Sequence, residues 1–384
     1  ERNVTTDSNG QFRVPLIPTG GYSVAISKAG YRSTADGNVS VALGSSAYTF
    51  TLASDAEAVS EIVITATANP QLDFAGTTTG LVVDLETLTK RVPIARSVTA
   101  VALLAPTVVR GGSSSDATFA NQPSIGGSSI AENAYYVNGL NITNFNTYIG
   151  GATVPFDFYK TIEVKTGGYP AEFGRSTGGV LNAVTKSGGN DFRFAVRGNW
   201  SPSSLTEQAK DTFQNANHRD YDRCEWLTFD ASGPIFEDRL FFYVMNQQQK
   251  VVSKFASKTT NSYNIDTRND PFWGVKLDGY ITDKQHLEFT WLDSTRQTDR
   301  RTYSYDGDTD VVGSELQGTT AFQAGAPSWV GKYTGSFTDW FTLSAAYGIS
   351  KDRDHTIPRN SADPLVKDQR SGTTSRNSQQ SKGN

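Results

Sequence analysis

The residue types that most often carry chemistry are few in this chain of 384 residues. Its three histidines, His218, His286 and His355, are scattered, with no carboxylate or second histidine at ligand spacing. The sequence therefore predicts neither a metal site nor a histidine-based nucleophilic triad. Cys224 is the only cysteine, which excludes an intrachain disulfide and a cysteine-rich zinc site. We expect no catalytic residue, no metal and no cofactor, and we predict that the protein is not an enzyme.

Two further patterns match binding sites only in part. Asp306, Asp308 and Asp310 could offer oxygen ligands to a divalent cation, but the glycine and the distal glutamate of a calcium loop are not in place. A solvated acidic loop is the favoured interpretation. The glycine pairs at 167–168 and 178–179 match neither a phosphate-binding nor a dinucleotide-binding loop, so we expect them in tight turns and close backbone packing.

The composition favours β-structure. Aromatic residues make up 11% of the chain and charged residues 19%, and there are 35 glycines, as expected for strands joined by tight turns. The formal net charge of -4 provides no basic surface for nucleic acid. The longest apolar runs, 101–105 and 240–245, are far shorter than the roughly 20 residues of a transmembrane helix. A mean hydropathy of -0.42 remains compatible with membrane-spanning strands, which alternate apolar and polar residues.

Residues 4–52 alternate as short strands between turns do, which predicts a half-buried antiparallel sheet. They resemble the carboxypeptidase regulatory-like β-sandwich without its opening strand, and a generic secreted sandwich is the alternative. The matching residues are Thr6, Asp7, Gly10, Phe12, Gly21, Tyr22, Gly30 and Tyr31. Because the sequence starts at Glu1 with neither a methionine nor a signal segment, we expect a mature form or an internal fragment.

A small and acidic stretch at 53–60 predicts a linker, and a run of β-branched residues follows it at 61–67. This run resembles the TonB box, the peptide that a TonB-dependent receptor presents to the periplasmic energy transducer. An accessible strand former can join the edge of another protein's sheet through main-chain hydrogen bonds. A buried strand of the preceding domain would look the same. The residues of the box are Glu61, Ile62, Val63, Ile64, Thr65 and Ala66.

Residues 70–189 resemble the plug domain of TonB-dependent outer-membrane receptors, in particular of the Oar-like receptors. An Asn-Gly pair at 138–139 between apolar positions predicts a hairpin turn. The segment 158–190 then joins I-E-V, E-F-G-R-S, G-G-V-x-N and T-K-S-G-G in the order and spacing that close a plug. The residues that match this plug signature are Tyr136, Asn138, Gly139, Ile162, Glu163, Val164, Glu172, Phe173, Gly174, Arg175, Gly178, Gly179, Asn182, Thr185 and Lys186.

Three charged residues of the plug signature could in principle form a catalytic constellation. They are Glu163, Glu172 and Arg175. Buried charge pairs that hold a plug inside a polar barrel lumen are the favoured interpretation. We therefore expect these side chains to be structural.

From residue 190 the pattern changes to longer alternating segments, which predicts membrane-spanning antiparallel strands of about ten residues. Short connections are expected to be periplasmic turns, and long polar ones extracellular loops. The seven predicted strands lie near 192–200, 225–233, 239–250, 271–281, 286–294, 328–337 and 341–350. The short connections are 234–238, 282–285 and 338–340, the long ones are 201–224, 251–270 and 295–327, and the tail 352–384 is predicted to be another extracellular loop.

Period-two alternation also predicts the face on which each side chain lies. The residues expected to face lipid include Phe194, Leu277 and Phe289, and those expected to face the lumen include Arg197, Lys276 and Glu288. Seven strands cannot close around a plug of this size. The resemblance implies a barrel of about 22 strands, so we expect most of it to lie beyond Asn384.

The predicted fold is mainly β: a regulatory-like β-sandwich at 1–53, a linker with the TonB box at 54–69, an α+β plug at 70–189, and the N-terminal part of a large antiparallel transmembrane β-barrel at 190–384. The resemblance implies TonB-dependent active transport of a ligand across the outer membrane of a Gram-negative bacterium, gated by the plug. The implied partners are the periplasmic TonB transducer, outer-membrane lipid and an extracellular ligand, without nucleic acid, and the N-terminal domain would be periplasmic. A non-transporting adhesion or structural protein of the envelope is the alternative.

Overall fold

A computed structural model shows that the chain forms two units. The first unit consists of Glu1–Val137 and Tyr159–Thr185. The second consists of Asn138–Phe158 and Lys186–Asn384. The predicted TonB box at 61–67 lies outside the described residues. The structure describes residues 3–7, 10–12, 14, 20–31, 33–41, 48–52, 78–111, 122–205, 207–338, 340–359, 365–367, 374–376 and 382–383.

The first unit begins with an antiparallel hairpin of β1 (Gly20–Ile26) and β2 (Thr34–Val41). Gly30, with φ at 79°, occupies the connecting turn, in which the amide of Tyr31 donates to the carbonyl of Lys28 at 3.1 Å. Glycine adopts this left-handed conformation without a steric cost. Phe12, which was expected in a strand, lies outside any strand.

A second sheet of the first unit carries six of the fifteen residues of the plug signature. Its core side chains, among them Ile162, Val164 and Val180, are fully buried. Short helices begin at side-chain caps, because Asp84 accepts from the amide of Thr87 and Ser97 from that of Ala100. In spatial order the strands of this sheet are β3 (Thr79–Asp84), β8 (Tyr159–Gly167), β9 (Val180–Thr185) and β6 (Ala134–Val137). The unit also contains α1 (Leu85–Arg91), α2 (Val98–Ala102), the paired strands β4 (Val108–Gly111) and β5 (Gln122–Ile125), and the 3-10 turn η2 (Ile130–Glu132).

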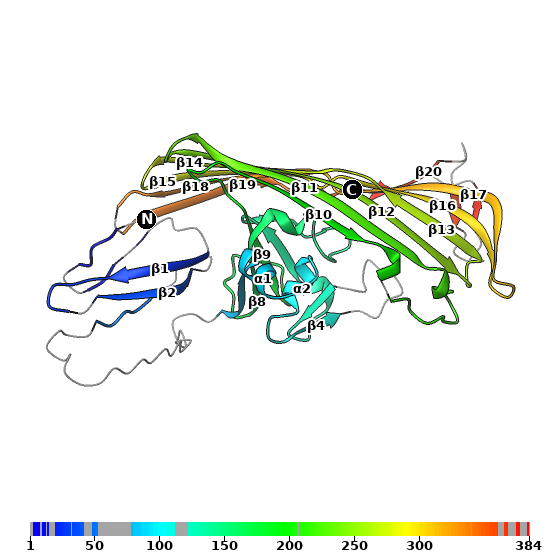
Figure 1. Ribbon diagram of the computed structural model, residues 1–384, viewed down its shortest axis with the longest axis horizontal. Helices are drawn as coiled ribbons and strands as arrows, with labels where there is room; N and C mark the ends of the chain where they lie inside the picture. The colour runs from blue at the N-terminus through cyan, green and yellow to red at the C-terminus, as the bar shows by residue number, and fades with distance from the viewer. Residues whose placement is uncertain are drawn as a thin grey trace. The chain divides into compact units, whose positions relative to one another are not determined.

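The second unit is built on a large antiparallel sheet in which each strand of a seven-strand series pairs with the next, as Figure 1 shows for its central strands. All seven predicted strands are confirmed, with short connections at 237–239, 283–284 and 337–341. The strands are β10 (Arg193–Ser201), β11 (Tyr221–Phe236), β12 (Leu240–Ser257), β14 (Phe272–Thr282), β15 (Gln285–Asp293), β18 (Pro327–Ser336) and β19 (Thr342–Ile349).

Exposure alternates along these strands as the sequence pattern predicted. Phe194 is 77% exposed and Phe289 39%, whereas Lys276 is 2% exposed. We call the side with Phe194, Leu277 and Phe289 the outer face of the sheet and the side with Lys276 the inner face. No helix within the described residues is long and apolar enough to cross a membrane.

Two of the three long connections are strands rather than loops, which corrects the expectation for 251–270 and 295–327. The distal half of β12 continues past its pairing with β14 and pairs with β13 instead (Figure 1). Arg300 pairs with Asp266 on one side of this extension at 2.7 Å, and the adjacent Arg301 points to the other side, so polar side chains occupy both sides there and the apolar alternation is lost. The extension contains β13 (Ser262–Arg268), β16 (Arg296–Asp306), β17 (Val311–Ala324) and β20 (Asp354–Pro358), paired in that order.

The remaining elements are short. β20 lies in the tail that was expected to be a loop, and it pairs with β17 because β17 would otherwise leave backbone groups unpaired at its edge. The other short elements are β7 (Leu140–Asn141), η3 (Phe156–Phe158), η4 (Ser203–Leu205), η5 (Asn217–Arg219), β21 (Leu365–Lys367), β22 (Thr374–Arg376) and β23 (Lys382–Gly383).

Candidate functional site: the plug signature, the inner face and the long connections

Three buried polar residues meet where β8 and β9 pair. Glu163 and Lys165 share one side of β8 and form an ion pair of 2.6 Å between side chains that are 9% and 6% exposed. Asn182, the register partner of Glu163 on β9, donates its amide to the same carboxylate at 3.4 Å. A buried carboxylate without a partner would be strongly destabilising, so Lys165 is what permits Glu163 in this core.

The expectation of buried charge pairs is confirmed for Glu163 and is wrong for Glu172 and Arg175. Glu172 and Arg175 are exposed in the connection between β8 and β9, and Arg175 has a left-handed φ of 64°. Phe173, between them, packs its ring edge-on against Tyr136 at 5.4 Å. The cation paired with Glu163 is instead Lys165. Residues two apart on a strand lie on the same side of the sheet, so these two side chains are neighbours.

The glycines of the plug signature have the structural use that was expected. A Cβ atom on Gly178 would lie 2.4 Å from Oγ of Ser128, and one on Gly179 would lie 2.4 Å from the side chain of Ile125. Asn138 and Gly139 have φ of 49° and 86°, which confirms the predicted turn. The end of β9 is equally tight, because Thr185 is fully buried.

In the second unit, the segment 138–158 is held against the inner face of the large sheet. Asn138 donates its amide to the hydroxyl of Thr290 on β15 at 2.8 Å. At the other end of the segment, the ring of Phe158 packs against Tyr243 and Phe272 at centroid distances of 5.9 and 5.6 Å. Gly274 makes room for this ring, since a Cβ atom there would lie 2.4 Å from it.

The next segment, 186–190, is held by the same face. The amide of Lys186 donates to the carbonyl of Phe158 at 3.0 Å. One residue later, Ser187 accepts from the ammonium group of Lys276 on β14 at 2.8 Å. Both segments that connect to the plug signature therefore have polar contacts with the inner face.

Lys276 is the centre of a charged group that we call the wall cluster. Its ammonium lies 3.4 Å from Asp278 and 3.3 Å from Glu288, and Lys332 on β18 lies 3.5 Å from Glu288. His286 lies between the same carboxylates, at 3.5 Å from Asp278 and 3.9 Å from Glu288. The wall cluster thus consists of Lys276, Asp278, His286, Glu288 and Lys332.

The expectation that the histidines lack carboxylate neighbours is wrong for His286 and His218. The 283–284 turn places Asp278 directly opposite Glu288, so residues ten apart in sequence become neighbours. Donor atoms of Asp278, His286 and Glu288 lie within 4.8 Å of one another, a spacing that would suit a metal ion. The ammonium of Lys276 already supplies a cation to both carboxylates, so we assign these residues to a charge network.

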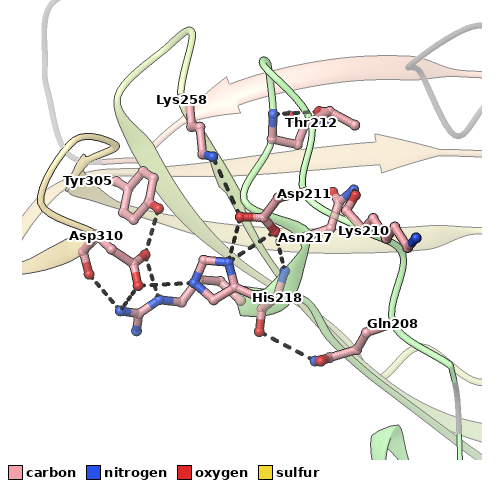
Figure 2. A network of polar contacts seen from close by, with 11 residues as sticks. Gln208, Lys210, Asp211, Thr212, Asn217, His218, Lys258, Tyr305 and Asp310 are labelled. Carbon is pink, nitrogen blue, oxygen red and sulfur yellow. Dashed lines mark hydrogen bonds and ion pairs between the residues drawn. The ribbon is translucent and has the colours of Figure 1, made fainter.

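The long connections 201–224 and 295–327 meet in a second network, which we call the loop cluster (Figure 2). His218 presents Nδ1 to Asp211 at 2.9 Å and Nε2 to Asp310 at 3.0 Å, and Arg219 reaches Asp310 at 3.0 Å. Asp310 also accepts from the hydroxyl of Tyr305 at 2.7 Å. The loop cluster is therefore Asp211, His218, Arg219, Tyr305 and Asp310.

Both ring nitrogens of His218 can donate only when the imidazole is protonated. The hydrogen bond with Asp211, followed by that with Asp310, accordingly raises the pKa of His218 above its usual 6.5. The hydrogen bond from Arg219, followed by that from Tyr305, lowers the pKa of Asp310. Nearby, burial raises the pKa of Asp220 to about 6.

The loop cluster also decides the interpretation of the acidic run at 306–310. Asp306 accepts from the amides of Asp308 and Thr309 and so closes its own turn. Asp310 points into the loop cluster and is bound there by Arg219 and Tyr305. The three aspartates are therefore not arranged around one cation, and two of them have structural partners.

Comparison with known proteins identifies two domains in the chain. Residues 1–53 match the family model of the carboxypeptidase regulatory-like domain, and residues 74–180 match that of the TonB-dependent receptor plug domain. Over 321 residues the chain is 30% identical to the TonB-dependent transporter Oar of Myxococcus xanthus. The match covers 79% of this chain and 28% of that transporter, so the chain spans less than a third of its relative's length.

Solved structures show the same fold at low sequence identity. The siderophore receptor PirA from Acinetobacter baumannii matches with a TM-score of 0.51 and 17% identity, over 79% of this chain and 43% of that one. The outer membrane transporter YddB from Escherichia coli matches with a TM-score of 0.53 and 14% identity, over 72% and 39% of the two chains. The chain is therefore mostly β, with a plug domain and part of a barrel sheet.

Proposed function

We propose that this chain, which carries the plug domain and barrel strands of a TonB-dependent outer-membrane receptor, takes part in active transport of a ligand across the outer membrane. Receptors of this family are located in the outer membrane, with the plug and the N-terminal domain on the periplasmic side. In the proposed cycle the plug closes the barrel until the periplasmic TonB transducer pulls on it. Lipid surrounds the outer face, and the ligand enters from the long connections.

The observation that best supports gating is the polar attachment of the two connecting segments. Asn138 with Thr290 and Ser187 with Lys276 are hydrogen bonds to the inner face, not apolar packing. Such bonds contribute about 0.5–1.5 kcal/mol between neutral groups and about 1.5–3 kcal/mol with a charged group, because water replaces a partner that leaves. These two attachments can be released without exposing apolar surface, whereas Phe158 would have to leave its packing against Tyr243 and Phe272.

The proposed coupling segment is the TonB box at Glu61, Ile62, Val63, Ile64, Thr65 and Ala66, which we infer from the sequence. It would act by adding a strand to the transducer, so its affinity would come from backbone donors and acceptors. Proline removes a backbone N–H and fixes φ. Val63→Pro or Ile64→Pro in the full-length receptor should therefore break the added strand.

The test is paired measurement of ligand binding at the cell surface and of energised uptake. At least one proline variant should lose uptake while surface binding persists, because the barrel and its connections are unchanged. Alanine at the same positions keeps the backbone donor and should have a milder effect. Undiminished uptake in both proline variants would rule out this TonB box, and binding without any energised uptake in the wild type would favour an adhesion protein instead.

A further inference from the structure

A pocket on the inner face lies where the segment 138–158 meets the distal ends of β12, β14 and β15. Its cavity volume is about 60 Å³, which is room for one small polar group of a ligand rather than for a whole drug-sized molecule. Thr153 and Pro155 line one side, and Gln247 and Gln249 of β12 line another. All the lining residues belong to the second unit.

Two arginines, Arg268 at the end of β13 and Arg296 at the start of β16, also line this pocket. Nε of Arg268 is buried and has no hydrogen-bond partner among the described residues. Arg296 donates to the hydroxyl of Thr153. Burial, followed by repulsion from Arg268, lowers the pKa of Arg296.

The acidic groups near the pocket do not neutralise this pair. Asp293 lines the pocket, but its carboxylate accepts from the amide of Thr295 at 3.0 Å. Asp352 and Asp354 favour the charged form of Arg296. Their effect is smaller than the opposing effects of burial and of Arg268. The pocket therefore contains two guanidinium groups and a single carboxylate that already has a backbone partner.

Neighbouring arginines of the same sheet are arranged differently. Arg300 holds Asp266 with two hydrogen bonds, and Arg223 binds Glu225 at 2.8 Å through Nε. Arg219 of η5 binds Asp310. These three arginines each have their own carboxylate, whereas no ion pair of Arg268 or Arg296 with a carboxylate occurs among the described residues.

We propose that this pocket binds an oxyanion, a carboxylate or phosphate group of a small organic ligand, between Arg268 and Arg296. The planar guanidinium presents a fork of donors that matches two oxygens of such a group. A bound anion would pair the free Nε of Arg268 and remove the repulsion between the two cations. The proposal rests on the proposed transport function, for which it names the chemical class of the ligand.

The first measurement is protection of arginines from phenylglyoxal in the full-length receptor, followed by peptide mass spectrometry. Citrate or inorganic phosphate at saturation should slow the modification of Arg268 and Arg296 by about tenfold or more. Maltose, a neutral probe, should not. Arg193, whose side chain is 78% exposed on β10, is the internal control and should react equally under all conditions.

The second measurement is citrate affinity by calorimetry for Arg268→Gln and Arg296→Gln, with Arg193→Gln as the matched control. Each pocket variant should weaken binding about tenfold, and Arg268→Lys, which keeps the charge but not the fork, should lie between. Unchanged affinity in both pocket variants, or no protection by either anion, would overturn the proposal. Binding requires no transducer, so anion binding without energised uptake would contradict the transport function alone, and uptake without protection would contradict this site alone.

Discussion

The wall cluster and the loop cluster use the same ingredients in two different settings. Each places a histidine between two carboxylates and adds a cation: Lys276 in the wall cluster, Arg219 in the loop cluster. The side chain of His286 is 10% exposed, and that of His218 is 46% exposed. The comparison teaches that burial, rather than residue type, decides whether such a group is a structural support or a titratable contact.

The reason is the cost of moving charge out of water. In the wall cluster, Lys276 and Asp278 have side chains only 3% and 6% exposed, so each charge depends on its partner. In the loop cluster, water can solvate any group that loses its partner, and each pair contributes little. The contrast therefore predicts a large loss of stability from a change in the wall cluster and a small one from a change in the loop cluster.

Removing the cation of the wall cluster should have the largest effect. Lys276→Met leaves Asp278 and Glu288 without their shared ammonium group, and should lower the free energy of unfolding in bilayers by about 3–5 kcal/mol. Arg193→Met, which breaks an exposed pair of 3.7 Å, should cost less than about 1 kcal/mol. Adding Asp278→Asn and Glu288→Gln to Lys276→Met should recover part of the lost free energy of unfolding, because no unpaired carboxylate then remains. Equal losses of unfolding free energy in Lys276→Met and Arg193→Met would show that burial does not decide the cost of removing a cation.

A charge on the outer face should come next. Phe289 is adjacent to Glu288 but points to the opposite side of β15, so Phe289→Arg should cost roughly 2–4 kcal/mol in bilayers. Phe213→Arg is the matched control, because Phe213 is 92% exposed in a long connection, and it should be nearly neutral. Wild-type stability for Phe289→Arg, together with a loss for Glu288→Leu, would reverse the two faces.

The smallest effect is the pH dependence of the loop cluster. The pKa of His218 is raised, so its bridge is fully present below pH 6.5 and is lost as pH rises through the raised pKa. Hydrogen exchange at the amides of Ala216 and Lys258, corrected for intrinsic rate, should accelerate about twofold to fivefold across that interval. Tyr305, with a pKa raised to about 12, stays protonated throughout.

Variants separate the groups that titrate nearby. His218→Gln should abolish the step in exchange, since glutamine cannot be protonated. The raised pKa of Asp220, about 6, also favours the closed form at low pH, so Asp220→Asn should remove a lower step and leave that of His218. Asp211 and Asp310 have lowered pKa values and would release the cluster only in acid below this interval. A step that survives His218→Gln would assign the pH dependence to another group.

The sequence predicts the strands of the large sheet well, because their two faces differ in polarity. Phe289 and Glu288 illustrate the period of two that sets both strand and register. The extension could not be found in this way. Its strand β16 has polar side chains on both sides, since the adjacent residues Arg300 and Arg301 point in opposite directions, so no alternation marks it.

Features of the candidate sites could be predicted from the sequence only where a short motif determines the local backbone conformation. The turn at Asn138 and the crowding around Gly178 follow from backbone requirements that a short motif can express. The partners of Glu163 and His286 depend on pairing between strands. The short connection at 282–285 was predicted, but the bulge between Tyr280 and Thr282 was not. Counting outward from the turn alone would pair Asp278 with Phe289, and the bulge pairs it with Glu288 instead.

The two hairpins of the extension are additions to the large sheet rather than parts of its framework. β15 pairs with β18 through 285–293 and 327–335, and β12 pairs with β14 through 240–247 and 272–279. None of those pairings uses a residue of β13, β16 or β17. Descendants of this chain can therefore lengthen, exchange or delete these hairpins while inheriting the same scaffold, so the extension is free to diversify at a pace that the scaffold itself does not follow.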